Sequence, residues 1–456
     1  MSCTGPQNRY VVESKIGTGA YGRVYLATDT LSGGKRVALK RLPHIKSCVE
    51  RAVMTLREIE IMALFRGHPH IVQLFHVFPI TPQAWTTPSL CTPETDIGLV
   101  MDLCEADLQH VIANVDKLNE DQIRFIVKGL LDALACLHAH GIVHRDIKHN
   151  NVFVDRNCHV KLGDFGMARF YGQPSRLPVY QGLWPAPSME ESKEGGGTSS
   201  PLSPPSMPLS DVNGALSHYV NALMYRAPEV LIRESEYGPG VDQWSLGCLF
   251  AELLQCIHVR KGKRVPMFPP RGGGGGGGAS TCISQELEDE QLKSIFQKLG
   301  TPPSVGWVRS KYARTRIKML PIYPTPPLIL GQVSDEARDL LHSLLCVDPS
   351  KRITAVDALN HPFFHKFSTT MPPSKPSVTA MEHAVPFLSL EEELSHVAIE
   401  SIIDPLRRAY LLKQSQQMLA TAIYSLHLPA VRVSEDHAMT GGEGSGEGSF
   451  ASFPAT

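Results

Sequence analysis

The chain has 456 residues, of which 42% are hydrophobic and 20% charged, so it can bury sizeable cores and is not disordered throughout. Lysine and arginine number 44 against 45 aspartates and glutamates, and the net charge of −1 excludes a global attraction to nucleic acid or to an anionic membrane. The ten cysteines form no CxxC pair and no dense framework, and the sequence shows neither a leader-like start nor a long apolar run. We therefore expect an intracellular protein of a reducing compartment.

The first part of the chain changes from a strand pattern to a helix pattern. Residues 10–41 carry short apolar runs split by glycine and turn residues, which predicts antiparallel strands. From Val49 onward, apolar residues recur every three or four positions, which predicts a helix with one apolar face. That apolar stripe consists of Val49, Ala52, Val53, Leu56, Ile59 and Ala63.

A stronger helical pattern covers about residues 120–140, and helices dominate the folded chain after it. Asn119 can cap the start of this helix and Gly141 can end it. The order of elements predicts a small strand-rich lobe and a larger helical lobe, joined near residues 102–104. The stripe of the second helix consists of Ile123, Ile126, Val127, Leu130, Leu131, Leu134 and Leu137.

Four stretches break the composition of the chain. Residues 79–96 are rich in proline and threonine, which predicts an inserted surface loop, and residues 171–216 are of low complexity. Residues 271–280 include seven consecutive glycines, which predicts a flexible tether, and the tail from about 430 is expected to be disordered.

The first chemical motif is Gly17-Thr18-Gly19-Ala20-Tyr21-Gly22. A GxGxxG run alone is weak evidence, because a dinucleotide-binding unit and a phosphate-covering hairpin both use it, and an ordinary glycine-rich turn also fits. The run GRVYLATD that begins at Gly22 is typical of a strand, whereas a dinucleotide site requires a helix there. A strand–loop–strand hairpin whose backbone N–H groups approach phosphate oxygens is the better interpretation.

Two charged residues extend this motif. Lys40 lies on a predicted strand in Val37-Ala38-Leu39-Lys40, and Glu58 lies in the helix that follows. Either residue alone is usually a solvated surface charge. Together they can form an ion pair in which Glu58 holds the Lys40 ammonium against the phosphates of a nucleotide.

The strongest motif is the run His144-Arg145-Asp146-Ile147-Lys148-His149-Asn150-Asn151, with Asp164-Phe165-Gly166 after it. It supplies a carboxylate, Asp146, that can accept a proton from a hydroxyl group. It also supplies two oxygen ligands, Asn151 and Asp164, of the kind that Mg²⁺ prefers.

With Ala227-Pro228-Glu229, Asp242 and Arg352, these motifs resemble the signature of the eukaryotic protein kinase family, over roughly residues 10–364. Runs such as TLREIEIM, DLCEADLQHVI and QLKSIFQKLGTP are similar to the group of mitogen-activated and cyclin-dependent kinases, and the mitogen-activated branch matches better. Lys148 is typical of serine/threonine kinases. The resemblance implies an α+β class, two-lobed protein kinase fold, with a small antiparallel-sheet N-lobe that carries one helix and a larger, mainly helical C-lobe.

The resemblance also implies the roles of the catalytic residues and the cofactors, ATP and Mg²⁺. Asp146 would accept the substrate hydroxyl proton beside Lys148, Lys40 would bind ATP phosphates, and Glu58 would position Lys40. Asn151 and Asp164 would hold Mg²⁺ between the lobes. Glu229 and Arg352 would form a buried structural ion pair.

The implied ATP pocket is lined by the glycine motif, by strand residues and by the segment between the lobes. Met101 resembles the gatekeeper behind adenine, backbone groups of Asp102 and Cys104 would bind adenine, and Asp107 is a candidate for the ribose. The ATP-binding set is Ile16, Gly17, Thr18, Gly19, Ala20, Tyr21, Gly22, Val24, Ala38, Lys40, Met101, Asp102, Cys104 and Asp107.

The activation segment departs from the family pattern. Mitogen-activated kinases carry Thr-x-Tyr where this chain has Ser217-His218-Tyr219. A phosphate on Ser217 or Tyr219 could pair with Arg145 and order the segment, although an unmodified segment is the alternative.

Two further positions, Ala222 and Leu223, differ from the Thr-Arg pair of relatives. The threonine hydroxyl bridges the catalytic aspartate and lysine, so its loss removes a hydrogen bond worth on the order of 1 kcal/mol. The missing arginine leaves open whether a proline must follow the target residue.

The resemblance divides the chain into a kinase domain with extensions at both ends. The 171–216 insertion holds Ser-Pro sites and a PxxP run, and is either regulatory or a passive loop. The C-terminal extension either packs on the C-lobe or docks a partner. The expected parts are an N-terminal extension (1–9), the kinase domain (10–364, with inserts near 79–96, 171–216 and 269–284), a partly helical extension (365–428) and a disordered tail (429–456).

The sequence favours an ATP-dependent serine/threonine protein kinase that modifies protein substrates in intracellular signalling. The alternative is a pseudokinase scaffold that binds nucleotide or partners without turnover, as Ala222 and Leu223 suggest. We expect protein substrates and an upstream activating kinase as partners, a monomer, no nucleic acid or membrane partner, and a cytoplasmic or nuclear location.

Overall fold

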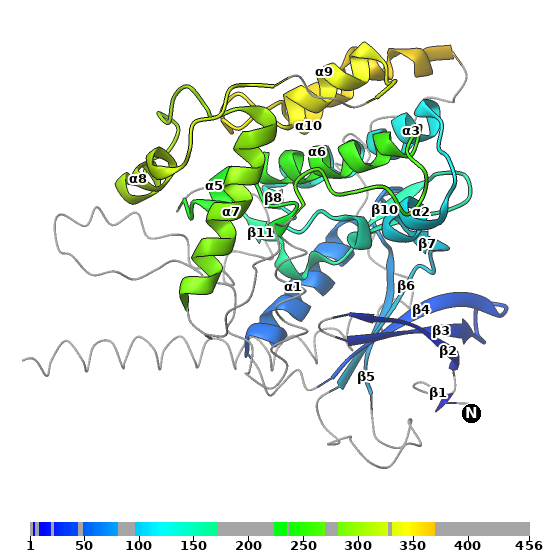
Figure 1. Ribbon diagram of the computed structural model, residues 1–456. Helices are drawn as coiled ribbons and strands as arrows, with labels where there is room; N and C mark the ends of the chain where they lie inside the picture. The colour runs from blue at the N-terminus through cyan, green and yellow to red at the C-terminus, as the bar shows by residue number, and fades with distance from the viewer. Residues whose placement is uncertain are drawn as a thin grey trace, which may run out of the picture. The chain divides into compact units, whose positions relative to one another are not determined.

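The N-terminal part of the molecule is a six-stranded antiparallel sheet (Figure 1). The computed structural model describes residues 3–4, 9–19, 22–43, 49–80, 96–171, 223–234, 237–269, 281–326 and 331–369. Along the sheet the strands follow the order β1-β2-β3-β4-β6-β5. Their bounds are β1 (Cys3–Thr4), β2 (Tyr10–Gly19), β3 (Gly22–Asp29), β4 (Lys35–Leu42), β5 (Leu74–Ile80) and β6 (Asp96–Met101).

The strands predicted for residues 10–41 are confirmed, and the N-terminal extension adds another one. Cys3 and Thr4 pair with Val12 and Val11 of β2. One set of apolar side chains from the sheet forms a separate small core, consisting of Tyr10, Ala27, Val37, Leu39, Phe78, Ile80 and Val100.

Helix α1 (Val49–Leu64) forms where it was predicted, but it is buried on more than one face. Ala63 of the predicted stripe is exposed, whereas Arg57, Glu58 and Met62 are buried. The reason is that α1 contacts both strand β5 and the 3-10 turn η5 (Phe165–Met167) of the larger lobe. A helix with one apolar stripe buries one face against one neighbour, whereas α1 buries two faces because it has two neighbours.

The predicted insertion near residues 79–96 is shorter at both ends than expected. Pro79 pairs with Ile97 and Ile80 pairs with Asp96, so β5 and β6 extend into the range assigned to the loop. Proline was expected to stop the strand, but β5 lies at the edge of the sheet, where a missing N–H donor is tolerated.

The other two insertion boundaries also move inward. Tyr171 donates its N–H to Gly141 O at 2.8 Å and its hydroxyl to His138 O at 2.9 Å, so it belongs to the folded lobe. Residues 281–284 form the first turn of helix α7 (Thr281–Leu299). The interiors of the three insertions and the part of the C-terminal extension after Thr369 lie outside the described residues.

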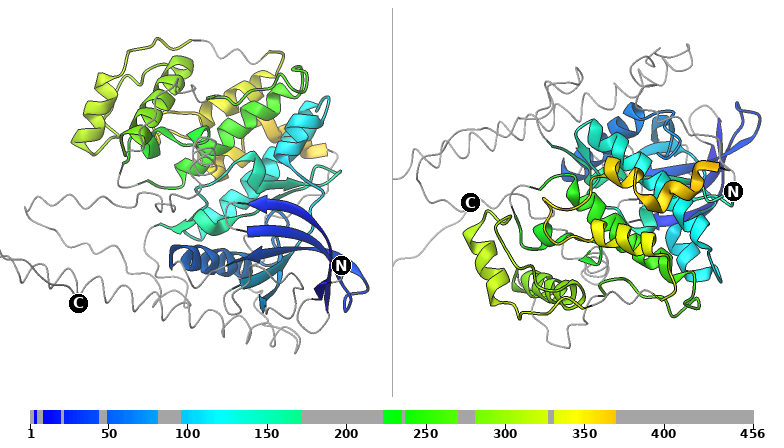
Figure 2. Two further views of the ribbon diagram at one scale, coloured as in Figure 1. Left: turned by 60° about the horizontal axis from the view of Figure 1, so that its bottom comes forward. Right: turned by 90° about the horizontal axis from the view of Figure 1, so that it is seen from above.

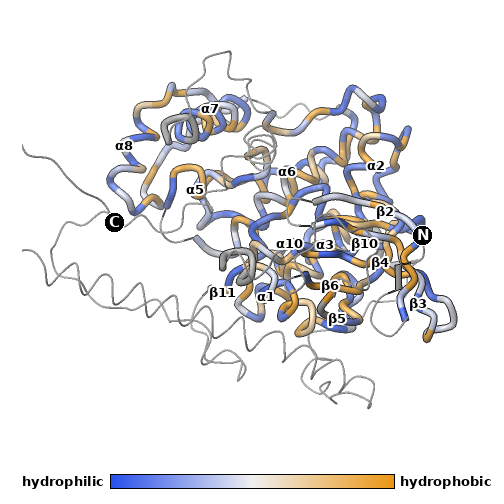
Figure 3. Tube along the Cα trace, turned by 90° about the horizontal axis from the view of Figure 1, so that it is seen from below, coloured by the Kyte–Doolittle hydropathy of each residue, from blue (hydrophilic) through white to orange (hydrophobic). Residues whose placement is uncertain are grey.

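The larger lobe is mainly helical (Figures 1 and 2), so the predicted two-lobed architecture, with a small antiparallel sheet that carries one helix and a larger helical lobe, is confirmed. Figure 3 shows hydrophobic residues along the neighbouring strands β5 and β6 of the sheet. The helices of the larger lobe are α2 (Leu108–Asn114), α3 (Glu120–Ala139), α5 (Pro228–Leu231), α6 (Gly240–Gln255), α7, α8 (Lys311–Met319), α9 (Asp335–Leu344) and α10 (Ala355–Leu359). Shorter elements are β7 (Ala106–Asp107), β8 (Ile142–Val143), η4 (His149–Asn151), β9 (Val152–Val154), β10 (Val160–Leu162), η5, β11 (Arg169–Phe170) and η8 (Pro362–Thr369). Within the described residues, no helix is both long and apolar enough to cross a bilayer.

Helix α3 matches its prediction in detail. Asn119 and Gln122 form a capping box at its start, and all seven residues of the predicted stripe are buried. Gly141 follows the helix end with φ of +72°, a backbone conformation that favours glycine.

Helix α6 is the centre of the larger lobe, because every residue from Val241 to Leu254 is buried. A helix buried on all sides forces its polar side chains to find protein partners. Its carboxylates Asp242 and Glu252 do so: Asp242 binds backbone N–H groups, and Glu252 accepts a hydrogen bond of 2.7 Å from the Tyr225 hydroxyl.

Glu252 predicts a measurable pH dependence of stability. Burial raises the pKa of Glu252 to about 7, against the smaller opposing effect of the Tyr225 hydrogen bond. Because the folded pKa lies above the unfolded value of 4.5, folding stability is lost as pH rises from about 4.5 to 7, by on the order of 2–3 kcal/mol. Glu252→Gln keeps an acceptor for Tyr225 and should make the protein more stable than wild type at pH 8 but not at pH 4.5. Urea unfolding at both pH values tests this, and equal differences at the two would contradict it.

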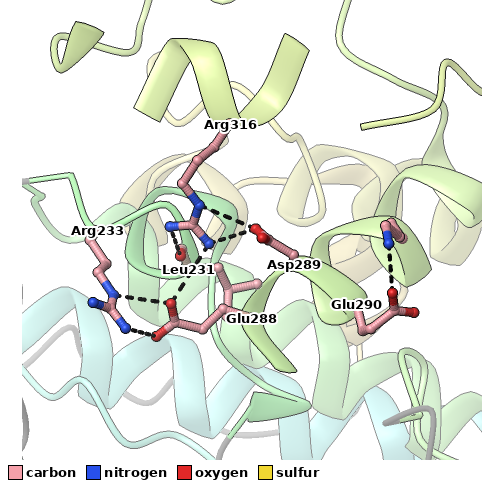
Figure 4. Close-up of polar contacts among 7 residues, drawn as sticks. Leu231, Arg233, Glu288, Asp289, Glu290 and Arg316 are labelled. Atoms are coloured by element: carbon pink, nitrogen blue, oxygen red, sulfur yellow. Dashed lines mark hydrogen bonds and ion pairs between the residues drawn. The ribbon is translucent and has the colours of Figure 1, made fainter. Parts of the chain in front are cut away.

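Two ion-pair groups brace the lobe. The predicted pair forms between Arg352 and Glu229, with N–O distances of 2.7 and 3.1 Å, and both side chains are buried. Figure 4 shows the second group, in which buried Arg316 of α8 contacts Asp289 of α7 at 2.6 Å and the Leu231 carbonyl of α5. Arg233 binds Glu288 of α7 at 3.0 Å from the other side. These contacts attach α7 and α8 to the helix that follows the activation segment.

Candidate active site

The glycine motif forms a hairpin between β2 and β3. Gly19 pairs with Gly22, and the chain continues from Gly22 into a strand and not into a helix. This excludes the dinucleotide-binding alternative. A Cβ atom at Gly22 would lie 2.4 Å from the Arg41 carbonyl oxygen, so this close approach of β3 to β4 requires glycine. Ala20 and Tyr21 lie outside the described residues.

Strand register brings the predicted pocket residues together. Val24 is opposite Lys40 across β3 and β4, and Ala38 is opposite Met101 across β4 and β6. Because alternate residues of a strand share a face, Ala38 and Lys40 lie on the same face of β4. Ile16 of β2 is 49% exposed, as expected of a side chain at the edge of an open site.

The segment between the lobes uses its acidic side chains for structure. The Asp102 carboxylate accepts hydrogen bonds from Gln73 N at 3.0 Å and from Lys161 Nζ at 2.5 Å. Asp107 caps helix α2 by accepting from His110 N at 2.7 Å. One carboxylate oxygen of Asp107 is therefore engaged, and the other remains for the predicted contact with ribose.

Burial raises the pKa of the Cys104 thiol to about 11, so Cys104 is protonated at neutral pH.

Lys40 lies between two carboxylates. Its Nζ atom is 2.5 Å from Glu58 Oε1 and 3.5 Å from Asp164 Oδ1, so the predicted ion pair is present. Burial alone would lower the pKa of Lys40, but the charges of Glu58 and Asp164 raise it above its usual value. Burial tends to raise the pKa of Asp164, yet the cations Lys40 and Lys148 lower it overall. Lys40 is therefore a fixed cation and Asp164 a fixed anion at neutral pH.

Helix α1 is attached to the Asp164-Phe165-Gly166 turn by a second residue. Buried Arg57 donates from Nη1 to the Gly166 carbonyl at 2.8 Å. Asp164 itself has φ of 63° and ψ of 69°, a left-handed conformation that is costly for a residue other than glycine. The surroundings therefore hold this carboxylate in one orientation.

The catalytic loop surrounds Asp146 with donors. Lys148 Nζ lies 2.7 Å from Asp146 Oδ2, and Asn151 Nδ2 donates to the same oxygen at 2.9 Å and to the Asp146 carbonyl at 2.8 Å. The side chain of Asp146 is 19% exposed, so the carboxylate is held firmly while it stays accessible. Such a carboxylate can accept a proton from a hydroxyl group beside it.

Asp242 of α6 supports the start of this loop. Its carboxylate accepts from His144 N at 2.8 Å, from Arg145 N at 2.7 Å and from the His138 imidazole at 2.8 Å. Its side chain is fully buried. Although burial works in the opposite direction, the His138 hydrogen bond and nearby charges hold the pKa of Asp242 below its usual value.

The residues predicted to hold Mg²⁺ fit a hard cation. Asn151 turns its Nδ2 toward Asp146, which leaves its carbonyl oxygen for another partner, and the Asp164 side chain is 36% exposed. Gly163 N donates to Asn151 O at 3.0 Å and so links the segments that carry the two ligands. Two oxygen ligands from the protein suit Mg²⁺, which usually completes its shell with phosphates and water.

The activation segment is described at its start, up to Tyr171, and at its end, from Leu223. Leu223 is 1% exposed and belongs to the core of the larger lobe, so a side chain at this position faces inward. Arg145 donates to the Tyr237 hydroxyl at 2.8 Å. Ser217, Tyr219 and Ala222 lie outside the described residues, and their predicted roles stay predictions.

Several residues of the site were not predicted from the sequence: Arg57, Lys161 and the structural role of Asp242. Arg57 follows Val53 by four positions, so a charge close to the apolar stripe was a usable signal. Nothing near Lys161 or Asp242 in the sequence indicates their partners, because each partner is tens of residues away along the chain.

The Lys40–Glu58 pair predicts unequal effects of its two conservative substitutions. Lys40→Met removes the phosphate-binding cation, and we expect phosphoryl transfer to fall by about 10²-fold or more. Glu58→Gln leaves Lys40 charged and near Asp164, so its loss should be smaller. Transfer rates at saturating MgATP measure both effects, and an equally active Lys40→Met variant would contradict the assignment.

Comparisons with known proteins agree with this geometry. The family model described as "Protein kinase domain" matches residues 10–364. Mitogen-activated protein kinase spk1 of Schizosaccharomyces pombe is 32% identical over 358 residues, which covers 78% of this chain and 77% of that protein. Mitogen-activated protein kinase 15 of Rattus norvegicus is 34% identical, over 79% of this chain and 54% of that protein. Cyclin-dependent kinase 7 of Dictyostelium discoideum is 30% identical, over 78% of this chain and 80% of that protein.

Proposed function

The chain belongs to the protein kinase family and is a serine/threonine kinase of the mitogen-activated branch, and from this premise we propose that it is catalytically active. It would transfer the γ-phosphoryl group of ATP to serine or threonine hydroxyls of protein substrates in intracellular signalling. An upstream kinase would control it by phosphorylating the activation segment, and the new phosphate would pair with Arg145 of the catalytic loop, next to Asp146.

One observation supports this proposal more than any other: the groups that the reaction needs are present and in mutual contact. Lys40 contacts both Glu58 and Asp164, and Asp146 contacts both Lys148 and Asn151. A scaffold that has lost catalysis would not need to keep both clusters in contact.

In this mechanism Asp146 accepts the hydroxyl proton as the substrate oxygen attacks the γ-phosphorus. Lys148, 2.7 Å from Asp146 Oδ2, orients that carboxylate and adds positive charge near the transferred group. Lys40 would bind ATP phosphate oxygens, and Glu58 limits the positions that its ammonium can take. Most of the catalysis is therefore positioning and electrostatic stabilisation.

Asn151 and Asp164 would hold the Mg²⁺ that accompanies ATP. When bound, Mg²⁺ neutralises phosphate charge and orients the β- and γ-phosphates. The left-handed backbone of Asp164 and the Asn151 bonds to Asp146 fix these two ligands relative to the proton acceptor.

The experiment is phosphoryl transfer from MgATP to a library of serine, threonine and tyrosine peptides. We expect phosphoserine and phosphothreonine products that disappear with excess EDTA, and also with Asp164→Asn. The residues that flank the modified position will show whether proline must follow it, given Leu223 in place of arginine. Nucleotide binding without any product, even after treatment with activating kinases, would favour the scaffold.

A further inference from the structure

The catalytic loop carries a histidine to which the mechanism assigns no step. His149 is the first residue of the turn η4, directly after Lys148. Its Nδ1 atom is buried and has no hydrogen-bond partner in the part of the chain that the structure describes. An unpaired buried polar atom costs free energy, so Nδ1 does not hold the ring in place. The ring is held by a side-chain hydrogen bond with Asn150 and by packing.

The packing partner is Tyr225, at the end of the activation segment. The two ring centroids are 5.6 Å apart and the ring planes meet at 89°, the edge-to-face arrangement that aromatic pairs favour. Tyr225 is 4% exposed, so this contact is shielded from water.

Tyr225 is attached to α6 at two points. Its hydroxyl donates to Glu252 Oε1 at 2.7 Å, and its carbonyl accepts from Ser245 Oγ at 2.8 Å. Asp242 of the same helix binds the N–H groups of His144 and Arg145. Helix α6 therefore holds the catalytic loop at its start directly and near its end through Tyr225 and His149.

The end held through His149 is the one that orients the Asp146 carboxylate. Lys148 and Asn151 flank His149, and both donate to Asp146 Oδ2. Asn151 N also donates to Lys148 O at 3.0 Å, which closes a single turn around His149. A displacement of His149 would move both donors together.

We propose that His149 is a positioning residue that holds Asp146 in its productive orientation by packing on Tyr225. The orientation of Asp146 then depends on the position of Tyr225 at the end of the activation segment. This inference rests on the proposed function.

Two substitutions separate packing from hydrogen bonding. His149→Ala removes the ring and should lower kcat about 3- to 10-fold, with KM for ATP within about twofold. His149→Phe keeps a ring against Tyr225 and should stay within about twofold of wild type in both constants. His342→Ala, at an exposed position of α9, is the matched control. Adding His149→Ala to Tyr225→Leu should cause little further loss, because both changes remove the same contact.

Amide hydrogen exchange of residues 144–151 tests the His149–Tyr225 contact without requiring catalytic activity. We expect faster exchange of this segment in His149→Ala and unchanged exchange in His149→Phe. Equal exchange in all three proteins, or a kcat for His149→Phe as low as that of His149→Ala, would overturn the proposal. If the wild type transfers no phosphate, the proposed function fails, and the exchange comparison still decides whether His149 holds the loop.

Discussion

Asp146→Asn is expected to lower kcat by about 10²- to 10⁴-fold, the range that a positioned general base contributes. The amide can still accept hydrogen bonds from Lys148 and Asn151, so the loop should keep its conformation. The amide cannot take the hydroxyl proton. We therefore expect ATP affinity and thermal stability close to those of wild type, with the loss confined to the chemical step.

The matched control for this substitution is Asp335→Asn, because the Asp335 side chain is 96% exposed and pairs with Arg338 at the start of α9. Its kcat should equal that of wild type. An Asp146→Asn variant that retains more than about a tenth of the wild-type kcat would mean that another group accepts the proton.

Asp242→Ala is expected to destabilise the protein by about 3–5 kcal/mol. The change leaves the His144 and Arg145 N–H groups and the His138 ring without their acceptor, all at a buried position. Asp242→Asn retains one acceptor oxygen and should lose less. Urea unfolding measures both, with Asp335→Ala as a control expected to shift stability by less than about 0.5 kcal/mol.

Asp242→Ala should also change how the free energy of unfolding depends on pH at acidic pH. The folded pKa of Asp242 lies below its usual value of 3.8, so its contribution is present above that pH and is lost as pH falls through the folded pKa. The stability difference between wild type and Asp242→Ala should therefore shrink below pH 3.8. A difference that stays constant down to pH 2 would contradict the buried, ionised state of Asp242.

The residues within each motif could be assigned from the sequence, because their partners are close along the chain or belong to a familiar set. The cap of α3 at Asn119, the Lys40–Glu58 pair and the Arg352–Glu229 pair are all present in the structure. The hairpin after Gly22 was decided by one local feature, the strand-like run that follows it.

The features that the sequence did not predict depend on tertiary neighbours that no local pattern reveals. The stripe of α1 was incomplete because the helix has a second contact surface in the larger lobe, and Pro79 was taken as a strand end because its place at the sheet edge is a property of the tertiary fold. His149 and Tyr225 are far apart in the chain, and they meet where α6 holds Tyr225 directly and the start of the catalytic loop through Asp242. The local sequence around one residue cannot predict such contacts between distant parts of the chain.

The most direct measurement is the stoichiometry of ADP formed to phosphopeptide formed, using the purified full chain, MgATP and a serine/threonine peptide from the library. An active kinase with Asp146 as the proton acceptor predicts one ADP for each phosphopeptide, and loss of both products together in Asp146→Asn. ATP binding with neither product after treatment with activating kinases, or ADP formed without phosphopeptide, would contradict phosphoryl transfer to protein hydroxyls as the function of this site.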